Sequence, residues 1–475
     1  MKKAIGFYPC PDIDTAAAQV VSHAGAVLLT ETIAVTGLGQ ALSAALGRWR
    51  PRLAVHDPAK VLLDLAVGLA VGGDCLADIA LLRSQPAVFG LVASDPTVSR
   101  TIDRLARDAT AVLAAIDTAR AAARAQAWRL AGENAPDQGI DAGTPLIIDV
   151  DATLVTAHSD KQGAAPTFKK GFGHHPLWAF VDHGAAGTGE PLAALLRPGN
   201  AGSNTALDHI EVLDEAITQL PARYRRNLLI TVDGAGATLD LVRHITDLNT
   251  APGRRVHYSV GFDLDHRGRT AIGQLSEGDW DQVLDHRGRP RDPDDAGVTE
   301  LTGLLRRSAD GDRLPNWPTD MRIMCRRERP SSGAQLSLME EADGWRYQLV
   351  ATNTPTRHAQ FLEARHRPHA RVEDRIRTGK NTGIGHLPSH SFALNQAWCV
   401  AATIACDLLC WLRLLCLEGP LARAEPKTLR YRLLHTAARL VRGQRKRKIR
   451  IPETWPWARE LEACFLTVFA LPPPA

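Results

Sequence analysis

Acidic residues stand at the ends of two apolar segments, and their placement could support chemistry on phosphate groups. Asp149 and Asp151 end the segment 146–151, and Asp233 ends the segment 228–233. Residues two apart on a strand project from one face, and a buried strand needs a metal ion, a basic partner or solvent to compensate two acids there. Carboxylate oxygens suit Mg²⁺ or Mn²⁺, which keep positions for water and substrate phosphates. The pattern predicts a metal site; the alternative is that these acids cap loops or helix starts.

Glu373 is the best candidate for the third acid of such a site. It lies in the segment 369–377, which we expect to form a helix opened by Pro368. A glutamate among arginines is often only a solvated ion-pair partner, but a catalytic acid beside phosphate-binding cations is what phosphodiester chemistry needs. The cations predicted to contact DNA phosphates here are Arg371, Arg375, Arg377 and Lys380.

The elements that must position these acids alternate between strands and helices. The apolar runs 146–151, 177–181, 192–196 and 228–233 predict strands, and the amphipathic pattern over 206–220 predicts a helix. The order is therefore strand, strand, strand, helix, strand, which favours an α/β domain with its chemistry at strand ends. If the first and last of these strands pair in parallel, their carboxyl ends bring Asp151 and Asp233 into one crevice.

These residues resemble the DDE transposases of bacterial insertion sequences. Asp-Ala-Thr at 151–153 and Val-Asp-Gly at 232–234 are similar to the motifs of the first and second acids, and Glu373 with Lys380 resembles the E-x6-K signature. His366 and His369 stand where the family has Tyr and Arg. The resemblance implies an α/β fold: an RNase H-like mixed-sheet catalytic core, interrupted by a β-rich insertion and flanked by helical N- and C-terminal regions.

The resemblance also implies an enzyme activity: metal-dependent cleavage at insertion-sequence ends and strand transfer into target DNA, as in cut-and-paste transposition. Asp151, Asp233 and Glu373 would be catalytic and would hold two Mg²⁺ or Mn²⁺ ions, with Asp151 bridging both. Lys380 would contact a phosphate near the cleavage point. The expected partners are double-stranded DNA, as terminal inverted repeats and as target, and a second copy in a homodimer on paired ends.

The same reading divides the chain into five regions. We expect a helical DNA-binding or dimerisation region over 1–140 and the first part of the catalytic core over 141–252. A β-rich insertion over 253–353 and the rest of the core, with the Glu373 helix, over 354–420 should follow. The region 421–475 is then a basic C-terminal region.

The net charge of +4 hides a strongly basic block near the C-terminus. Between Leu421 and Arg450 the chain carries eleven basic residues and one acid, Glu425. A segment with charges of one sign usually binds a polyanion. The alternatives are a flexible segment exposed to solvent or a segment that resembles a localisation signal. The residues predicted to contact DNA are Arg442, Arg445, Lys446, Arg447, Lys448 and Arg450.

Secreted and membrane classes are not favoured. The start of the chain has no apolar run before its first acids, so we expect no secretory signal. The most apolar stretch, 397–417, contains Asp407 and Arg413, which argues against a membrane span. The eight cysteines form no CxxC pair, and four of them lie in this apolar stretch and are typical of core residues in a reducing cytosol: Cys399, Cys406, Cys410 and Cys416. With the resemblance, this predicts a bacterial cytoplasmic, nucleoid-associated protein.

Two other functions fit parts of the pattern. The segment 146–154 also resembles the haloacid-dehalogenase phosphatase motif, in which Asp149 would be the nucleophile and Asp151 the acid/base. The chain could also be a catalytically inactive transposase relic that binds DNA. Loss of cleavage on substitution of Asp151 would separate these alternatives from a transposase.

Overall fold

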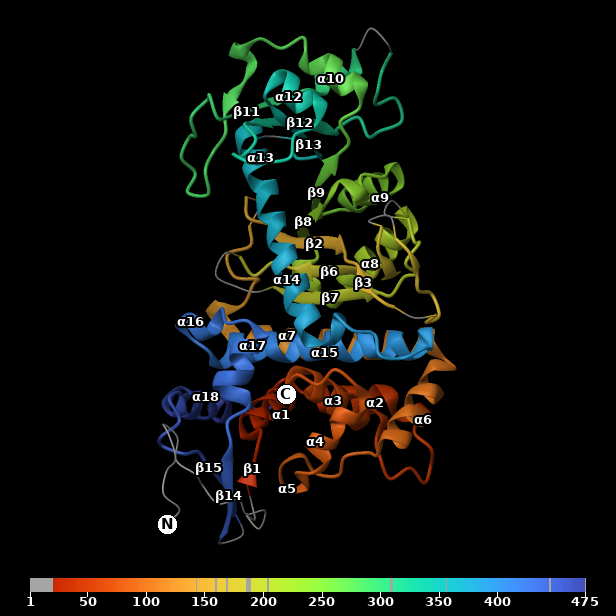
Figure 1. Cartoon of the computed structure of the whole chain (residues 1–475), viewed down its shortest axis with the longest axis vertical. Coiled ribbons are helices and arrows are strands. Elements are labelled where there is room, and N and C mark those ends of the chain that lie inside the picture. Colours follow the sequence, from red (N-terminus) through yellow and green to blue (C-terminus); the bar gives the residue numbers. More distant parts are fainter. Residues whose placement is uncertain are drawn as a thin grey trace, which may run out of the picture.

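The computed structural model describes residues 20–474 except 142, 159, 168–169, 185–188, 203–204, 308–310, 356 and 444–445. The predicted DNA contact Arg445 and the N-terminal segment on which the signal-peptide expectation rests lie outside these residues. Figure 1 shows a molecule with the sheet in its upper half and most helices in its lower half.

The main sheet has nine strands in the order β10-β11-β12-β13-β9-β8-β2-β6-β7. Five of them form the core that carries the predicted acids, and in it β2, β8 and β9 run parallel while β6 and β7 are antiparallel to their neighbours. The core strands are β2 (Leu146–Ala152), β6 (Leu177–Val181), β7 (Glu190–Leu195), β8 (Asn227–Val232) and β9 (Arg255–Phe262). The predicted strands at 146–151, 177–181, 192–196 and 228–233 are thus confirmed to within two residues.

Two of the helices that pack on the core sheet are held there by an apolar stripe. In α8 (Ala206–Gln219) the buried residues include Val212, Leu213 and Ala216, which face β6 and β7. In α9 (Leu239–Thr250) the Thr238 hydroxyl accepts a bond from a backbone N–H of the first turn, and the helix packs on β9. The predicted helix over 206–220 is therefore confirmed.

The β-rich insertion extends the same sheet. From β9 the chain adds antiparallel strands in the spatial order β13, β12, β11 and β10. Its elements are α10 (His266–Ile272), β10 (Asp281–Gln282), β11 (Ala296–Glu300), α11 (Thr302–Arg306), β12 (Arg322–Glu328), α12 (Leu338–Asp343) and β13 (Arg346–Thr352). The region 253–353 that we predicted as the insertion also contains β9, which pairs with β8 from Arg255 to Val260. Nothing in the local sequence distinguishes this strand from those that follow.

A small sheet lies between β2 and β6 in the sequence. It consists of β3 (Val155–Thr156), β5 (Phe172–His174) and β4 (Ala165–Pro166), in that order. Gly199 packs against it so closely that a Cβ would lie 2.0 Å from the carbonyl oxygen of Gly173. The loop after β7 is thereby held against the segment that follows Asp151.

Helices form the N-terminal part of the described chain, as predicted. They are α1 (Val27–Val35), α2 (Leu38–Leu46), α3 (Pro58–Ala70), α4 (Ala80–Arg83), α5 (Pro86–Phe89), α6 (Asp95–Ala106) and α7 (Ala109–Ala131). The helical pattern over 98–125 is divided between α6 and α7 by a break at residues 107–108.

The C-terminal part begins with helices that cross from the insertion to the core. They are α13 (Ala359–His366), α14 (Arg371–Gly379) and α15 (Phe392–Cys416), followed by α16 (Gly419–Ala422), α17 (Pro426–Leu429), β14 (Ala438–Gly443), β15 (Lys446–Arg450) and α18 (Ala458–Ala470). In Figure 1, α15 runs between the sheet and the N-terminal helices, and it packs on α3, α7 and β7. The fold class is the predicted one: an α/β core with a β-rich insertion and helical regions on either side.

A buried ion network joins the N-terminal helices to the core. Arg124 of α7 pairs with Glu190 of β7 and with Asp407 of α15, and all three side chains are fully buried. Arg120 also pairs with Asp407, at 2.8 Å. Glu190 accepts further bonds from the indole N–H groups of Trp128 and Trp411. Buried charges persist only when they are paired in this way, so the network fixes how α7, β7 and α15 sit together.

The same network explains the acid in the apolar helix α15. Among the described residues α15 is long and apolar enough to cross a membrane, but 83% of its most apolar window is buried inside the protein. Asp407 lies at the contact with Arg120 and Arg124. Cys399, Cys406 and Cys410 are buried, and burial raises the pKa of Cys399 and Cys406 to about 12. These two thiols are core residues, as predicted.

Candidate active site

Asp151 and Asp233 emerge side by side where two parallel strands end. The register of β2 and β8 pairs Val150 with Val232, so each of the two acids follows the same rung of the ladder. Asp151 is half-buried and Asp233 is exposed, immediately before a short turn at Gly234–Gly236. The sequence placed Asp151 and Asp233 in one crevice only if these two strands pair in parallel, and they do.

Asp149 occupies a different environment although it is on the same face of β2. Its side chain is 1% exposed. It accepts hydrogen bonds from the Thr231 hydroxyl and, at 3.0 Å, from Nδ1 of His369. It also forms an ion pair with Arg375. Burial alone would raise the pKa of Asp149, but these donors and the charge of Arg375 outweigh it, so its pKa is lowered. Asp149 is therefore a buried counter-ion, and Asp151 is the acid nearer to solvent.

His369 lies among the acids at the start of the segment that carries Glu373. It is in the 3₁₀ turn Arg367–Ala370, which leads directly into α14. Burial would lower the pKa of His369, but the bond to Asp149 and the negative charges of Asp149, Asp151 and Asp233 raise it. The position of His369 thus ties the start of α14 to the ends of β2 and β8.

Glu373 stands one helical turn after His369 and is exposed. Lys380 directly follows α14 and is also exposed. The three predicted catalytic acids do not all lie within 4.8 Å of one another: the described residues contain two groups of three potential ligands that close together, and neither includes them.

The arginines predicted to bind DNA near Glu373 have different environments. Arg375 is 3% exposed and bridges Asp149 and Asp182, so its predicted contact with DNA is not supported. The reason is geometric, since a residue two positions after Glu373 projects from another side of the helix. Arg371 pairs with Asp182 at 3.2 Å, whereas Arg377 is exposed and forms ion pairs with Asp374 and Glu425.

Asp182 and Gly189 complete the environment of Arg375, and sequence reasoning missed both. Gly189 has a φ of +77°, and a Cβ there would lie 2.3 Å from Nε of Arg375. A glycine is therefore required both by its backbone conformation and by the packed guanidinium. Asp182 directly follows β6. An acid at the end of this strand, as at the ends of β2 and β8, was the signal from which the sequence could have predicted its place near the site.

His366 shows how a second imidazole is held neutral beside the site. Its Nδ1 is 2.9 Å from the hydroxyl of Ser259 on β9. Burial, and the charge of His369, lower the pKa of His366 to about 4. A neutral ring packed against β9 anchors the end of α13, so α13 and α14 enter the site at a fixed position.

The predicted basic block forms a β-hairpin. Strands β14 and β15 pair antiparallel, with Arg439 opposite Arg450 and Val441 opposite Lys448. Leu440 is buried in a small cluster with Val21, and Ile449 packs against that cluster, so the alternate residues Arg439, Lys448 and Arg450 face outward and are exposed. Arg442, Lys446 and Arg447 also lie on these two strands. Like charges directly opposite each other are unfavourable without an anion.

The donor set of the site fits a divalent cation. Asp151, Asp233 and Glu373 are all partly or fully exposed carboxylates, and hard oxygen ligands of this kind suit Mg²⁺ or Mn²⁺. The nearby acid that would compete as a ligand, Asp149, is already occupied by Thr231, His369 and Arg375.

Comparison with known proteins places the chain in a family. The family model described as "Transposase DDE domain group 1" matches residues 9–473. The chain therefore belongs to the DDE transposase family. No curated protein matches it. Among solved structures it is similar to a piggyBac transposase in a synaptic complex with hairpin DNA, with 8% identity and a TM-score of 0.40 over 87% of this chain and 79% of that chain.

Proposed function

We propose that this transposase cuts DNA at the ends of an insertion sequence and joins them to target DNA, with Asp151, Asp233 and Glu373 as the catalytic acids. The observation that carries the proposal is the parallel register of β2 and β8, which sets Asp151 beside Asp233 at the edge where α14 begins. The haloacid-dehalogenase alternative needs Asp149 as a free nucleophile, but Asp149 is buried in an ion pair with Arg375.

Two Mg²⁺ or Mn²⁺ ions held by these three acids would activate the attacking oxygen and stabilise the leaving oxygen in phosphoryl transfer. The protein residues do the rest. Arg375 ties α14 to β2 through Asp149 and to the end of β6 through Asp182, which fixes the helix that carries Glu373. Lys380, exposed after α14, is available to bind a phosphate near the reacting one.

The proposed partners are double-stranded DNA, as terminal inverted repeats and as target, and a second copy of the chain. The exposed face of the β14–β15 hairpin, with Arg439, Lys448 and Arg450, would bind the phosphate backbone. We place this activity in the bacterial cytoplasm, at the nucleoid, where the DNA lies. A homodimer would hold two element ends at once.

The test is cleavage by the full chain of a DNA duplex that carries the inverted repeats flanking the gene. With Mg²⁺ or Mn²⁺ the wild type should cut at the repeat end, and Asp151→Asn and Asp233→Asn should not. Asp240→Asn is the matched control, because Asp240 is an exposed acid on α9 shortly after Asp233. Full cleavage by Asp151→Asn would refute the assignment of the first acid. Binding without cleavage by the wild type would identify an inactive relic.

A further inference from the structure

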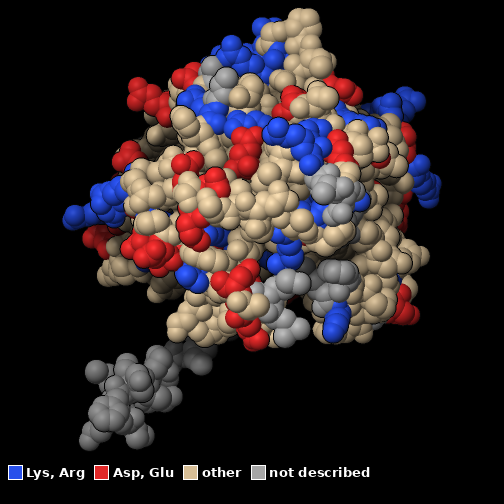
Figure 2. All heavy atoms as spheres, turned by 90° about the horizontal axis from the view of Figure 1, so that it is seen from above, with Lys and Arg blue, Asp and Glu red and all other residues tan. Residues whose placement is uncertain are grey.

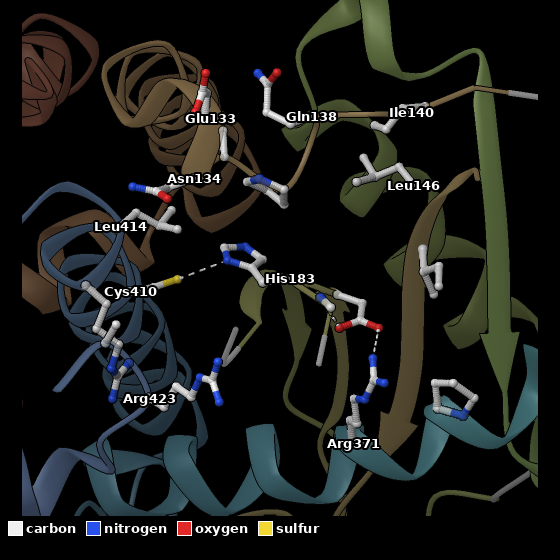
Figure 3. A pocket seen from close by; sticks show the side chains of 18 of the residues that line it. Glu133, Asn134, Gln138, Ile140, Leu146, His183, Arg371, Cys410, Leu414 and Arg423 are labelled. Carbon is white, nitrogen blue, oxygen red and sulfur yellow. Dashed lines mark hydrogen bonds and ion pairs between the residues drawn. The ribbon is translucent and has the colours of Figure 1, made fainter. Parts of the chain in front are cut away.

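A large cavity opens at the end of the core sheet opposite to Asp151. Its volume is about 1300 Å³, and its walls include Leu146 and Ile147 at the start of β2 and Asp182 just after β6. The end of α15 and the segment that follows it form another wall. Figure 3 shows His183, Cys410, Arg371 and Arg423 around this space.

Four arginines line the cavity: Arg365, Arg371, Arg413 and Arg423. Arg371 has a carboxylate partner, Asp182, which it shares with Arg375. Within the described part of the chain, the other three form no ion pair with an acid. The remaining acids of the lining, Glu133 and Glu418, are exposed. The arginines that line the cavity therefore carry positive charge that the acids of the lining do not neutralise.

Two of the uncompensated arginines are shielded from solvent to different degrees: Arg413 is buried, and Arg365 is half-buried with its Nη2 donating to the hydroxyl of Thr354. Arg413 is 4% exposed, and its Nη2 donates to the carbonyl of Ala424 at 2.8 Å. Its Nε is buried and has no hydrogen-bond partner in the described structure, and the same holds for Nε of Arg365. Burial lowers the pKa of Arg413 and lowers that of Arg365 to about 10. A buried guanidinium without an anion is unfavourable, and an anion in the cavity would remove that penalty.

We propose that this cavity binds phosphate groups of the DNA backbone, a few base pairs away from the catalytic acids. The inference rests on the proposed function. Asp151 lies five positions after Leu146 along β2, about 17 Å at the usual rise, and this distance matches about five base pairs of one B-form strand. Arg371 lines the cavity from α14, the helix that carries Glu373. One helix therefore contributes both to the catalytic site and to the cavity.

Arginine suits this ligand because its planar guanidinium binds phosphate oxygens with two parallel bonds. Arg423 is exposed at the cavity and would meet the backbone first. Arg413 and Arg365 lie deeper and would bind a phosphate that enters. Free phosphate offers the same chemistry, so the experiment must separate it from DNA.

The test measures binding of a fluorescein-labelled terminal-repeat duplex in EDTA, over a series of KCl concentrations. Arg423→Glu should weaken binding about tenfold and lower the salt slope by about 1. The control is Arg52→Glu, since Arg52 is an exposed arginine on the loop between α2 and α3; it should leave both quantities unchanged. Wild-type affinity and slope in Arg423→Glu would overturn the proposal.

A second variant protects the test against a folding artefact. Arg413→Met removes the buried charge and keeps the volume, so it should weaken DNA binding while the melting temperature stays the same or rises. A purely structural Arg413 predicts the reverse, a lower melting temperature with unchanged DNA affinity, and this result would contradict the proposal. If inorganic phosphate stabilises the wild type but not Arg413→Met, while DNA affinity is equal, the site takes free phosphate and the DNA assignment is wrong.

Cleavage separates this inference from the proposed function. If the wild type binds DNA but does not cut it with Mg²⁺ or Mn²⁺, and Arg423→Glu still weakens binding, the proposed activity fails and the cavity assignment stands. If the wild type cuts DNA and both cavity variants bind it normally, the cavity assignment fails alone.

Discussion

At the scale of single residues, the structure separates two acids that are two positions apart on one strand. Asp149 and Asp151 share a face of β2, but Asp149 is buried against Arg375 and His369 whereas Asp151 is half-buried at the strand end. A buried carboxylate paired with a buried guanidinium holds structure together, and a carboxylate close to solvent is available to a metal ion and a substrate.

Substitutions at these two positions should therefore have different effects on stability. Asp149→Ala leaves the buried Arg375 with only Asp182 as its partner, and we expect it to lower the free energy of unfolding by about 3–5 kcal/mol. Asp151→Ala should change that free energy by less than about 1 kcal/mol while it abolishes cleavage. Urea unfolding of both variants measures the difference. Equal stabilities would contradict the assignment of Asp149 as a counter-ion.

The pH dependence of stability should reveal another residue, Glu215 on α8. Burial, followed by the charge of Asp117, raises its pKa from 4.5 to about 8. Between these values the folded state keeps a proton that the unfolded state has lost, so the free energy of unfolding should fall as pH rises from about 4.5 to 8. The loss should not exceed about 1.4 kcal/mol per pH unit. Denaturant unfolding at several pH values should show this fall in the wild type.

Glu215→Gln should flatten this part of the stability curve and stabilise the protein at pH 8, because the neutral amide needs no proton. Glu460→Gln, which changes an exposed glutamate on another helix, α18, is the matched control and should behave as the wild type. A curve for Glu215→Gln that still falls between pH 4.5 and 8 as steeply as the wild type would refute the explanation.

At the scale of elements, charged groups lock α7 and α15 onto β7. Asp407 is fully buried between Arg120 and Arg124, and both arginines form ion pairs with it. The N-terminal helices thus depend on a residue of the C-terminal half for their position on the core.

Removal of that acid should be strongly destabilising. We expect Asp407→Ala to lower the free energy of unfolding by about 3–5 kcal/mol, because two buried guanidinium groups lose a shared partner. Asp108→Ala, which breaks the exposed pair with Arg48, should cost about 1 kcal/mol or less. Thermal or urea unfolding compares them, and similar effects of the two substitutions would show that the buried network contributes little.

The β14–β15 hairpin is the second element with a testable role. Lys448 and Arg450 are exposed on one side of it, so Lys448→Glu with Arg450→Glu should lower the salt slope of DNA binding by about 2. The fold should persist, because Leu440 and Ile449 pack on the other side. A salt slope that does not change would remove the hairpin from the DNA interface.

At the scale of the whole molecule, the two ends differ in how their charges are arranged. Figure 2, seen from the insertion end, shows basic and acidic side chains interspersed. Many insertion arginines are paired, among them Arg291 and Arg326 with Glu328 and Arg322 with Glu300. Arg439, Lys448 and Arg450 are exposed on the hairpin, at the other end in Figure 1, and form no ion pair with another residue that the structure describes. This contrast supports the proposed DNA contact at the hairpin end.

The sequence predicted the parts of the fold that depend on local pattern. The strands β2, β6 and β8 were predictable because each is a short, mostly apolar run with a sharp polar end. The pairing of β9 with β8 was not, since it depends on which neighbour a strand chooses. The hairpin was not expected either, because a run of basic residues is typical of a flexible segment. Only the structure shows that Leu440 and Ile449 pack in a small apolar cluster.

The same limit applies to the site. Asp151, Asp233 and Glu373 were found from residue types and motif spacing, both of which are local. The partnership of Asp149 with Arg375 joins residues 226 positions apart, and only the folded chain could assign Arg375 to a buried bridge rather than to DNA.

The most direct test of the catalytic assignment compares two adjacent acids on α14. Glu373 and Asp374 are both exposed, but only Glu373 is proposed to bind a metal ion. In single-turnover cleavage of terminal-repeat DNA with Mg²⁺, Glu373→Gln should reduce the rate by more than about a hundredfold, since even partners of metal ligands contribute 10–100-fold. Asp374→Asn should cut at close to the wild-type rate. Normal cleavage by Glu373→Gln, or equal loss in both variants, would contradict the three-acid site.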